Sequence, residues 1–196
     1  KVERPVSGRT SGGSFQSARE SVASTQGVTD DWVMDLHEKD QADVDNPQAV
    51  AEYAADIFVY LKEREQVGRV GDYMTQQEDL TEKMRAILVD WLVGGHWKFK
   101  LQQETLLLTV HLLDTYLSKK QVKRQKLQLV GVTCMLLAAK HEEIYPPEIK
   151  DFVHVTDRAY TRQEILDTEV TVLNTIGFQL THPSGRQFLM RYVKLM

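Results

Sequence analysis

The sequence predicts an all-α fold: a five-helix bundle around one central apolar helix, preceded by an extra N-terminal helix. Apolar residues recur at three- and four-residue steps in segments that begin or end at glycine or proline. One segment, residues 124–142, is apolar nearly all round, which is the pattern of a helix at the centre of a bundle. Strand signals are missing from the sequence, because no alternating runs are joined by Asn-Gly or Asp-Gly turns.

Residues 1–45 predict a disordered, acidic tail. Residues 1–28 are rich in serine, glycine, threonine and glutamine, and their few apolar residues have no period. Residues 30–45 hold seven acidic residues against one base, Lys39. We interpret this acidic stretch as a solvated linker.

Residues 46–71 predict the extra helix and a loop. Asn46 is of the type that caps a helix, and Pro47 suits the first helical position. The glycines Gly68 and Gly71 end the element. Between these signals the apolar residues follow helical spacing: Val50, Tyr53, Ala54, Ile57 and Leu61.

Residues 72–180 predict the bundle itself. The first helix stops at Gly94-Gly95, the fourth follows Pro146-Pro147, and the fifth begins with a Thr161/Glu164 capping box and ends at Gly177. The five helices are expected at about residues 80–93, 104–117, 124–142, 148–155 and 162–176.

Residues 181–196 predict a turn and the start of a further helix, at about residues 186–194. A helix of about ten residues is marginal alone in water. We therefore expect it to begin a second, truncated domain.

Composition excludes several classes of partner. The formal net charge is −4 and the pI is near 5.9, so no basic excess is available to hold a phosphate backbone, and no nucleic-acid partner is expected. The longest charge-free apolar stretch, residues 127–139, is shorter than the roughly 20 residues of a membrane span, so no membrane partner is expected. The single cysteine, Cys134, excludes a disulfide framework and indicates a reducing compartment, nucleus and cytoplasm.

No catalytic or metal-binding constellation stands out. Cys134 lies in an uncharged run and is interpreted as a small buried hydrophobe. Residues 141–145 begin like a zinc-protease helix but place Tyr145 where the second histidine must be. No glycine-rich phosphate loop is present. The sequence therefore predicts a protein that is not an enzyme and has no cofactor and no metal.

The first bundle helix carries more apolar residues than one core-facing stripe needs. One interpretation, favoured by the pattern alone, buries both of its apolar sides. The other leaves one side partly exposed as a shallow groove for a short peptide. The candidate groove side carries Met84, Ile87, Leu88 and Trp91, and the other side carries Ala86, Val89 and Val93.

Five charged residues interrupt apolar runs: Arg85, Asp90, Asp114, Lys140 and Glu169. Long charged side chains are almost never buried unpaired, because desolvation costs several kcal/mol for each ion. Arg85 and Asp114 are expected to form an internal salt bridge. Lys140 and Glu169 lie where apolar helix ends or changes face, so they either pair internally or offer hydrogen bonds to the backbone of a partner.

Three segments, residues 84–92, 126–133 and 142–149, resemble successive signatures of the cyclin box. Residues 98–101 and 103–105 resemble the mitotic B type more than other cyclins. The resemblance covers about residues 46–194 and identifies the chain as similar to the N-terminal cyclin box of B-type cyclins. It implies tandem cyclin folds, of which this chain holds the first and a stub of the second, and a cyclin-dependent protein kinase as partner.

The resemblance also implies roles for individual residues. Lys140 and Glu169, with His141, would bind the kinase, on a face supported internally by Arg85, Asp114 and Leu129. Two positions depart from the family: Gly94 replaces an acidic residue of some cyclins, and His141 replaces an aromatic ring. The implied groove for Arg-x-Leu motifs of substrates and inhibitors consists of Met84, Ile87, Leu88, Trp91 and Gln128.

The function implied is that of a regulatory subunit, which activates a cyclin-dependent serine/threonine kinase at G2/M and helps to recruit substrates. One alternative is a cyclin-fold adaptor in transcription, although an acidic chain lacks the basic face that DNA contact needs. A second alternative is a truncated product without kinase-activating ability.

Overall fold

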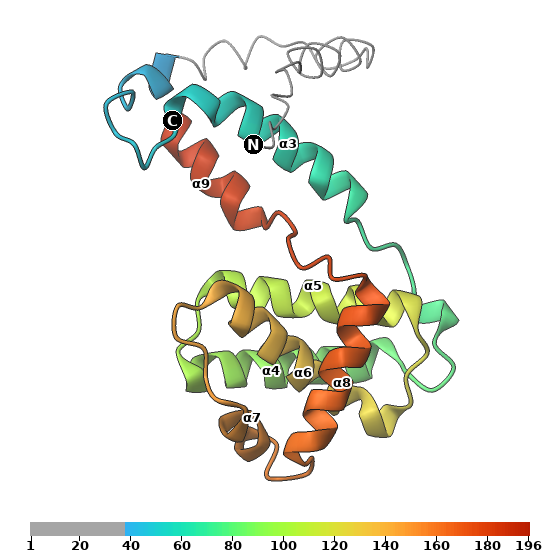
Figure 1. Cartoon of the computed structure of the whole chain (residues 1–196). Coiled ribbons are helices and arrows are strands. Elements are labelled where there is room, and N and C mark those ends of the chain that lie inside the picture. Colours follow the sequence, from blue (N-terminus) through green and yellow to red (C-terminus); the bar gives the residue numbers. More distant parts are fainter. Residues whose placement is uncertain (1–37) are drawn as a thin grey trace, which may run out of the picture.

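A computed structural model of the chain describes residues 38–196 (Figure 1). The predicted tail at residues 1–28 lies outside the described residues. All regular elements of the described part are helices, so the all-α five-helix prediction is confirmed. The bundle consists of α4 (Glu82–Phe99), α5 (Gln103–Lys119), α6 (Arg124–Glu142), α7 (Ile149–Val155) and α8 (Arg162–Ile176).

Helix α6 lies at the centre of the bundle, as its apolar character predicts. Residues 129–139 are all buried, and α4, α5, α7 and α8 each pack against this helix (Figure 1). Cys134 is fully buried within it, and burial raises the pKa of the thiol well above its ordinary value. The predicted role of Cys134 as a small core residue is therefore consistent with its position.

Helix α4 does not stop at Gly94-Gly95, so that prediction is wrong. The helix continues to Phe99 and ends at Lys100, which adopts left-handed backbone angles with φ 54°. Gly95 is buried, and a Cβ at this position would lie 3.4 Å from Met135 Sδ. The glycine thus lies inside the helix, against Met135 of α6, and does not end the helix.

The predicted start of the N-terminal helix is also wrong. Asn46 accepts a hydrogen bond from the Gln48 N–H at 3.1 Å and forms a turn, so Pro47 does not begin a helix. Val50 then has a positive φ of 49°, which breaks the helical path. A 3-10 turn, η1 (Ala51–Tyr53), leads into α3 (Ala54–Val67), and a second one, η2 (Met74–Gln76), precedes α4.

Helices α3 and α9 (Gly185–Leu195) lie side by side, apart from the bundle (Figure 1). Phe58 is buried between two α9 rings, with its centroid 5.8 Å from those of Phe188 and Tyr192. The outer side of α9 exposes Leu189 and Met190. That α9 begins a second cyclin fold stays a prediction.

The interpretation of the acidic stretch as a solvated linker is wrong at Asp40. This residue is 6% exposed, and its carboxylate accepts hydrogen bonds from Arg191 at 2.7 Å and Lys194 at 3.0 Å. The hydrogen bond from Arg191 is the main cause that lowers the pKa of Asp40, against the opposing effect of burial. Asp40 therefore ties the N-terminal segment to α9.

Both ends of α8 are as the sequence predicts. Thr161 and Glu164 form the capping box, in which each side chain accepts a hydrogen bond from the backbone N–H of the other residue. Gly177 ends the helix with φ 68°, a conformation that favours glycine.

Candidate functional site

Lys140 and Glu169 form an ion pair between α6 and α8. The Lys140 Nζ lies 2.5 Å from Glu169 Oε1. The Lys140 side chain is 47% exposed, whereas that of Glu169 is 11% exposed. The pair therefore lies at the surface with one well-anchored carboxylate, whose second oxygen has no hydrogen-bond donor among the described residues. Both residues retain hydrogen-bonding capacity toward a partner.

Apolar side chains close in sequence to both members of this ion pair are exposed. Val170, next to Glu169, is 58% exposed, and Ile144 and Tyr145, just beyond α6, are 87% and 91% exposed. His141, beside Lys140, is exposed, and its Nε2 lies 3.9 Å from Glu142 Oε1. An exposed apolar surface around a polar pair is typical of a protein-binding site. We name the surface of Lys140, His141, Ile144, Tyr145, Glu169 and Val170 the α6–α8 face.

Lys140, His141 and Glu169 on this face were predictable from the sequence, but its exposed apolar residues were not. Ile144 and Tyr145 precede Pro146-Pro147, and a pair of large apolar residues directly before two prolines is a weak signal of exposure. Val170 carried no such signal, because it falls within the ordinary apolar spacing of its helix.

Arg85 and Asp114 form the expected salt bridge. Arg85 donates through Nε at 2.7 Å to one Asp114 oxygen and through Nη2 at 2.6 Å to the other, a bidentate pair between α4 and α5. This hydrogen bonding raises the pKa of Arg85 above its ordinary value. Leu129 is buried in α6, 3% exposed. That these three residues support a partner-binding face stays a prediction.

Tyr73 completes this polar cluster, and the sequence analysis missed it. Its hydroxyl donates a hydrogen bond to Asp114 Oδ1 at 2.5 Å. Burial is the main cause that raises the pKa of the Tyr73 phenol, and the hydrogen bond to Asp114 is the second cause. Gln77, four residues on, bonds the Leu117 carbonyl at 2.7 Å. The segment before α4 is thus fixed to α5 by two long-range polar contacts, and no local sequence pattern could show their partners.

The candidate groove on α4 is partly core. Ile87 is 62% exposed, but Leu88 is 6% exposed and packs against Gly131 of α6. Met84 and Trp91 are half-buried, as is Gln128. The two interpretations of this helix side are therefore both partly realised: Leu88 belongs to the core, and its neighbours border the surface. The docking role of the groove stays a prediction.

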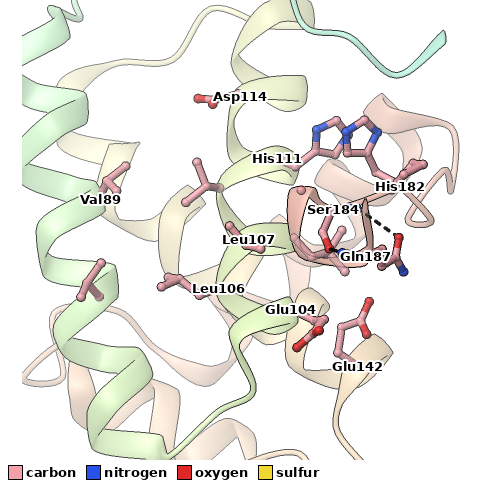
Figure 2. A pocket seen from close by; sticks show the side chains of 15 residues that line it. Val89, Glu104, Leu106, Leu107, His111, Asp114, Glu142, His182, Ser184 and Gln187 are labelled. Atoms are coloured by element: carbon pink, nitrogen blue, oxygen red, sulfur yellow. Dashed lines mark hydrogen bonds between the residues drawn. The ribbon is translucent and has the colours of Figure 1, made fainter. Parts of the chain in front are cut away.

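The other apolar side of α4 lines a hollow of about 390 Å³ (Figure 2). Val89 faces α5 across it, and Glu104 and Glu142 lie at one end. His111 and His182 stack at the other end, with ring centroids 3.6 Å apart and planes 4° apart. Burial lowers the pKa of His111 to about 4, with a further contribution from His182, and burial also lowers the pKa of His182.

Two further observations concern residues 38–196. No three or more histidine, cysteine, aspartate or glutamate side chains converge there as metal ligands. None of the helices in this part of the chain is both long and apolar enough to cross a bilayer.

Comparisons with known proteins agree with this architecture. Residues 56–181 match the family model described as "Cyclin, N-terminal domain". The chain is 46% identical over 168 residues to G2/mitotic-specific cyclin S13-6 of Glycine max, covering 86% of this chain and 37% of that protein. It is 51% identical over 156 residues to G2/mitotic-specific cyclin-B of Marthasterias glacialis, covering 79% of this chain and 40% of that protein.

A solved structure of a viral cyclin from herpesvirus saimiri is similar, with a TM-score of 0.65 and 25% sequence identity. The match covers 69% of this chain and 60% of that chain. The chain spans less than half the length of these two curated relatives.

Proposed function

The chain belongs to the cyclin family, with B-type mitotic relatives, and we propose that it regulates a cyclin-dependent serine/threonine kinase at G2/M. The kinase would bind at the α6–α8 face. The observation that carries this proposal is the Lys140–Glu169 pair at 2.5 Å, with the exposed Val170 directly after Glu169 and the exposed Ile144 and Tyr145 just beyond the end of α6. Apolar contact would supply affinity, and the ion pair would hydrogen-bond a partner backbone and fix its register.

The mechanism is a shift of the kinase's conformational population. A protein kinase is active when its strand lysine pairs with the C-helix glutamate and its activation loop is ordered. A surface that binds only the inward position of the C-helix stabilises the active state by its differential affinity. The chain itself would supply no catalytic group, so we propose a regulatory subunit and not an enzyme.

The packing of the bundle supports this role. Helices α6 and α8 pack directly against each other, and α4 and α5 are joined beside them by the bidentate Arg85–Asp114 pair. A preformed surface loses little conformational entropy on binding, so more of its contact energy favours the active kinase.

Substrate recruitment is a second part of the proposal. The exposed Ile87, with half-buried Met84, Trp91 and Gln128, offers a shallow apolar strip for the leucine of an Arg-x-Leu motif. The motif's arginine would lie toward Gly94, which has no carboxylate of its own, and the exposed Asp90 lies one helical turn before it. We further propose action in the nucleus and cytoplasm.

The test adds the whole chain to a purified, inactive cyclin-dependent kinase and measures the rate of histone phosphorylation. A large rise in rate supports the proposal. A complex that forms but stays inactive would show that this part of the protein binds without activating. Absence of a complex would favour the adaptor alternative.

A further inference from the structure

The junction between α5 and α6 carries a concentrated positive charge. Five of its eight residues, 119–126, are lysine or arginine and none is acidic, although the whole chain has a net charge of −4. All five are exposed. We name this surface the basic ridge: Lys119, Lys120, Lys123, Arg124 and Lys126.

Only part of this charge is neutralised within the molecule. Arg124 Nε lies 3.1 Å from Asp79 Oδ1, and Lys126 Nζ lies 3.5 Å from Glu164 Oε1. Lys119, Lys120 and Lys123 have no ion-pair partner among residues 38–196. The ridge thus retains three uncompensated cations. The positive end of the α6 dipole adds to them, because α6 begins directly after Lys123.

The ridge contains a concave part. Lys123 and Lys126 line a hollow of about 290 Å³ between the ends of α5 and α6 and the side of α8. The hydroxyls of Thr168 and Thr171 border it, but both donate to carbonyls of their own helix, at 2.7 and 2.9 Å. An anion in this hollow would therefore be held by the lysines.

The ridge is continuous with the candidate docking groove. Arg124 lies one helical turn before Gln128 on α6. Arg124 also binds Asp79, through its side chain and through its backbone N–H, which donates at 2.9 Å. Asp79 lies just before the first turn of α4, and Met84 lies in that turn. A peptide that leaves the groove at Met84 would pass over Arg124 and reach Lys123.

We propose that the basic ridge extends the docking groove and binds phosphorylated segments of substrates whose Arg-x-Leu motif occupies that groove. This inference rests on the proposed function. If the motif's arginine lies toward Gly94, the residues after its leucine lie at Met84 and the ridge. A phosphoryl group carries nearly two negative charges and three acceptor oxygens, which suits clustered lysines better than a single carboxylate does. Phosphoryl groups added by the bound kinase would then strengthen docking of the same substrate.

The test measures peptide affinity for the whole chain by fluorescence anisotropy. One peptide carries an Arg-x-Leu motif followed by two phosphoserines, and its partner carries serines at the same positions. We expect about fivefold tighter binding of the phosphorylated peptide, as for two exposed charge pairs. This gain should shrink as salt is raised from low to physiological concentration.

The variant Lys120→Gln with Lys123→Gln should lose the gain and bind both peptides as wild type binds the unphosphorylated one. Neither lysine side chain has an ion-pair partner among the described residues, so the fold should be unaffected. The control Lys39→Gln with Lys150→Gln removes the same charge from exposed positions on other elements and should keep the gain.

Each alternative outcome is distinct. Equal binding of both peptides to wild type would overturn the role of the ridge and leave the groove standing. Binding of neither peptide would contradict the groove and, with it, the ridge. An RNA oligonucleotide that binds as tightly as the phosphopeptide, and depends on the same two lysines, would overturn the proposal in favour of a nucleic-acid surface.

Discussion

At the scale of single residues, the informative side chains are polar groups enclosed by an apolar bundle. Asp114 accepts hydrogen bonds from Arg85 and Tyr73 together, which joins α4, α5 and the segment before α4. The sequence predicts the Arg85–Asp114 pair, because two opposite charges interrupt neighbouring apolar helices. It could not predict Tyr73, because a tyrosine in a polar loop has no pattern that identifies a partner 41 residues away.

We expect Arg85→Ala to lower the free energy of unfolding by about 1–2 kcal/mol, because Asp114 loses two charged hydrogen bonds. The effect should lie at the lower end of the usual range, since the Arg85 side chain is 32% exposed and water can replace part of the interaction. Urea unfolding measures the change. The control Arg162→Ala removes an exposed arginine with no ion-pair partner among the described residues and should change stability little. Equal effects of the two variants would contradict a structural role for the pair.

The stacked histidines predict an acid-dependent loss of stability. The pKa of His111 is about 4 in the folded protein, against 6.5 in the unfolded chain, because burial and His182 disfavour its charged form. The unfolded state therefore binds more protons between these values, so stability is complete above pH 6.5 and falls as the pH decreases toward 4. For His111 the loss is at most about 2 kcal/mol at pH 5.

Urea unfolding between pH 7 and pH 5 measures this dependence. The variant His111→Asn should flatten the curve, whereas His154→Asn, at an exposed position on α7, should leave it as in wild type. If the free energy of unfolding of the His111 variant depends on pH as steeply as that of wild type, groups other than His111 cause the pH dependence.

At the scale of elements, glycine has two opposite roles in the helices. In α4, Gly94 has open space where a Cβ would lie. In α6, a Cβ at Gly131 would lie 2.9 Å from Leu88 Cδ1. The same substitution should therefore have opposite effects at the two positions, which both lie inside helices.

We expect Gly94→Ala to raise the free energy of unfolding by up to about 1 kcal/mol, through helix propensity alone. Gly131→Ala should lower it by about 1–3 kcal/mol, because overpacking displaces Leu88 and separates α4 from α6. Thermal unfolding of both variants gives the comparison. Stabilisation by both substitutions would mean that Leu88 repacks without cost and that the contact between α4 and α6 is loose.

The limits of sequence analysis are also visible in these elements. The apolar pattern of α6 and the capping box of α8 are local signals, and both predicted the structure correctly. Glycine and the Asn-Pro pair are ambiguous signals, because each can mark a helix boundary but also occurs inside a helix or in a turn. Gly95 lies inside α4, against Met135 of α6, and Asn46 closes a turn. Both placements depend on structure that the local sequence does not contain.

The same distinction holds for the candidate site. The charges at Lys140 and Glu169 were predictable, because charge within an apolar helix needs an explanation. Exposure of Val170 was not predictable, because apolar spacing on α8 does not show which neighbours cover it. The basic ridge is visible in the sequence as a run of charge, but its continuity with the groove depends on the packing of α6 beside α4.

At the scale of the whole molecule, the bundle presents three surfaces with different chemistry. The α6–α8 face combines one ion pair with exposed apolar residues, the strip on α4 is shallow and apolar, and the ridge is cationic. A second layer, α3 with α9, is held by Phe58 and Asp40. We propose kinase binding at the first surface and substrate docking at the other two, so substitutions on one should leave the others intact.

The most direct test of the central claim is the affinity of the chain for a purified cyclin-dependent kinase, measured by calorimetry. The variant Lys140→Ala with Glu169→Gln alters the pair on the α6–α8 face. The matched control, Lys126→Ala with Glu164→Gln, alters another lysine–glutamate pair between the same two helices, 3.5 Å apart. Circular dichroism should show the same helical content for all three proteins.

We expect the first variant to lose about 2–5 kcal/mol of binding free energy, as when desolvated polar contacts at an interface are removed. The control should bind as wild type does. Wild-type affinity in the Lys140/Glu169 variant, with its helical content unchanged, would contradict the assignment of kinase binding to the α6–α8 face.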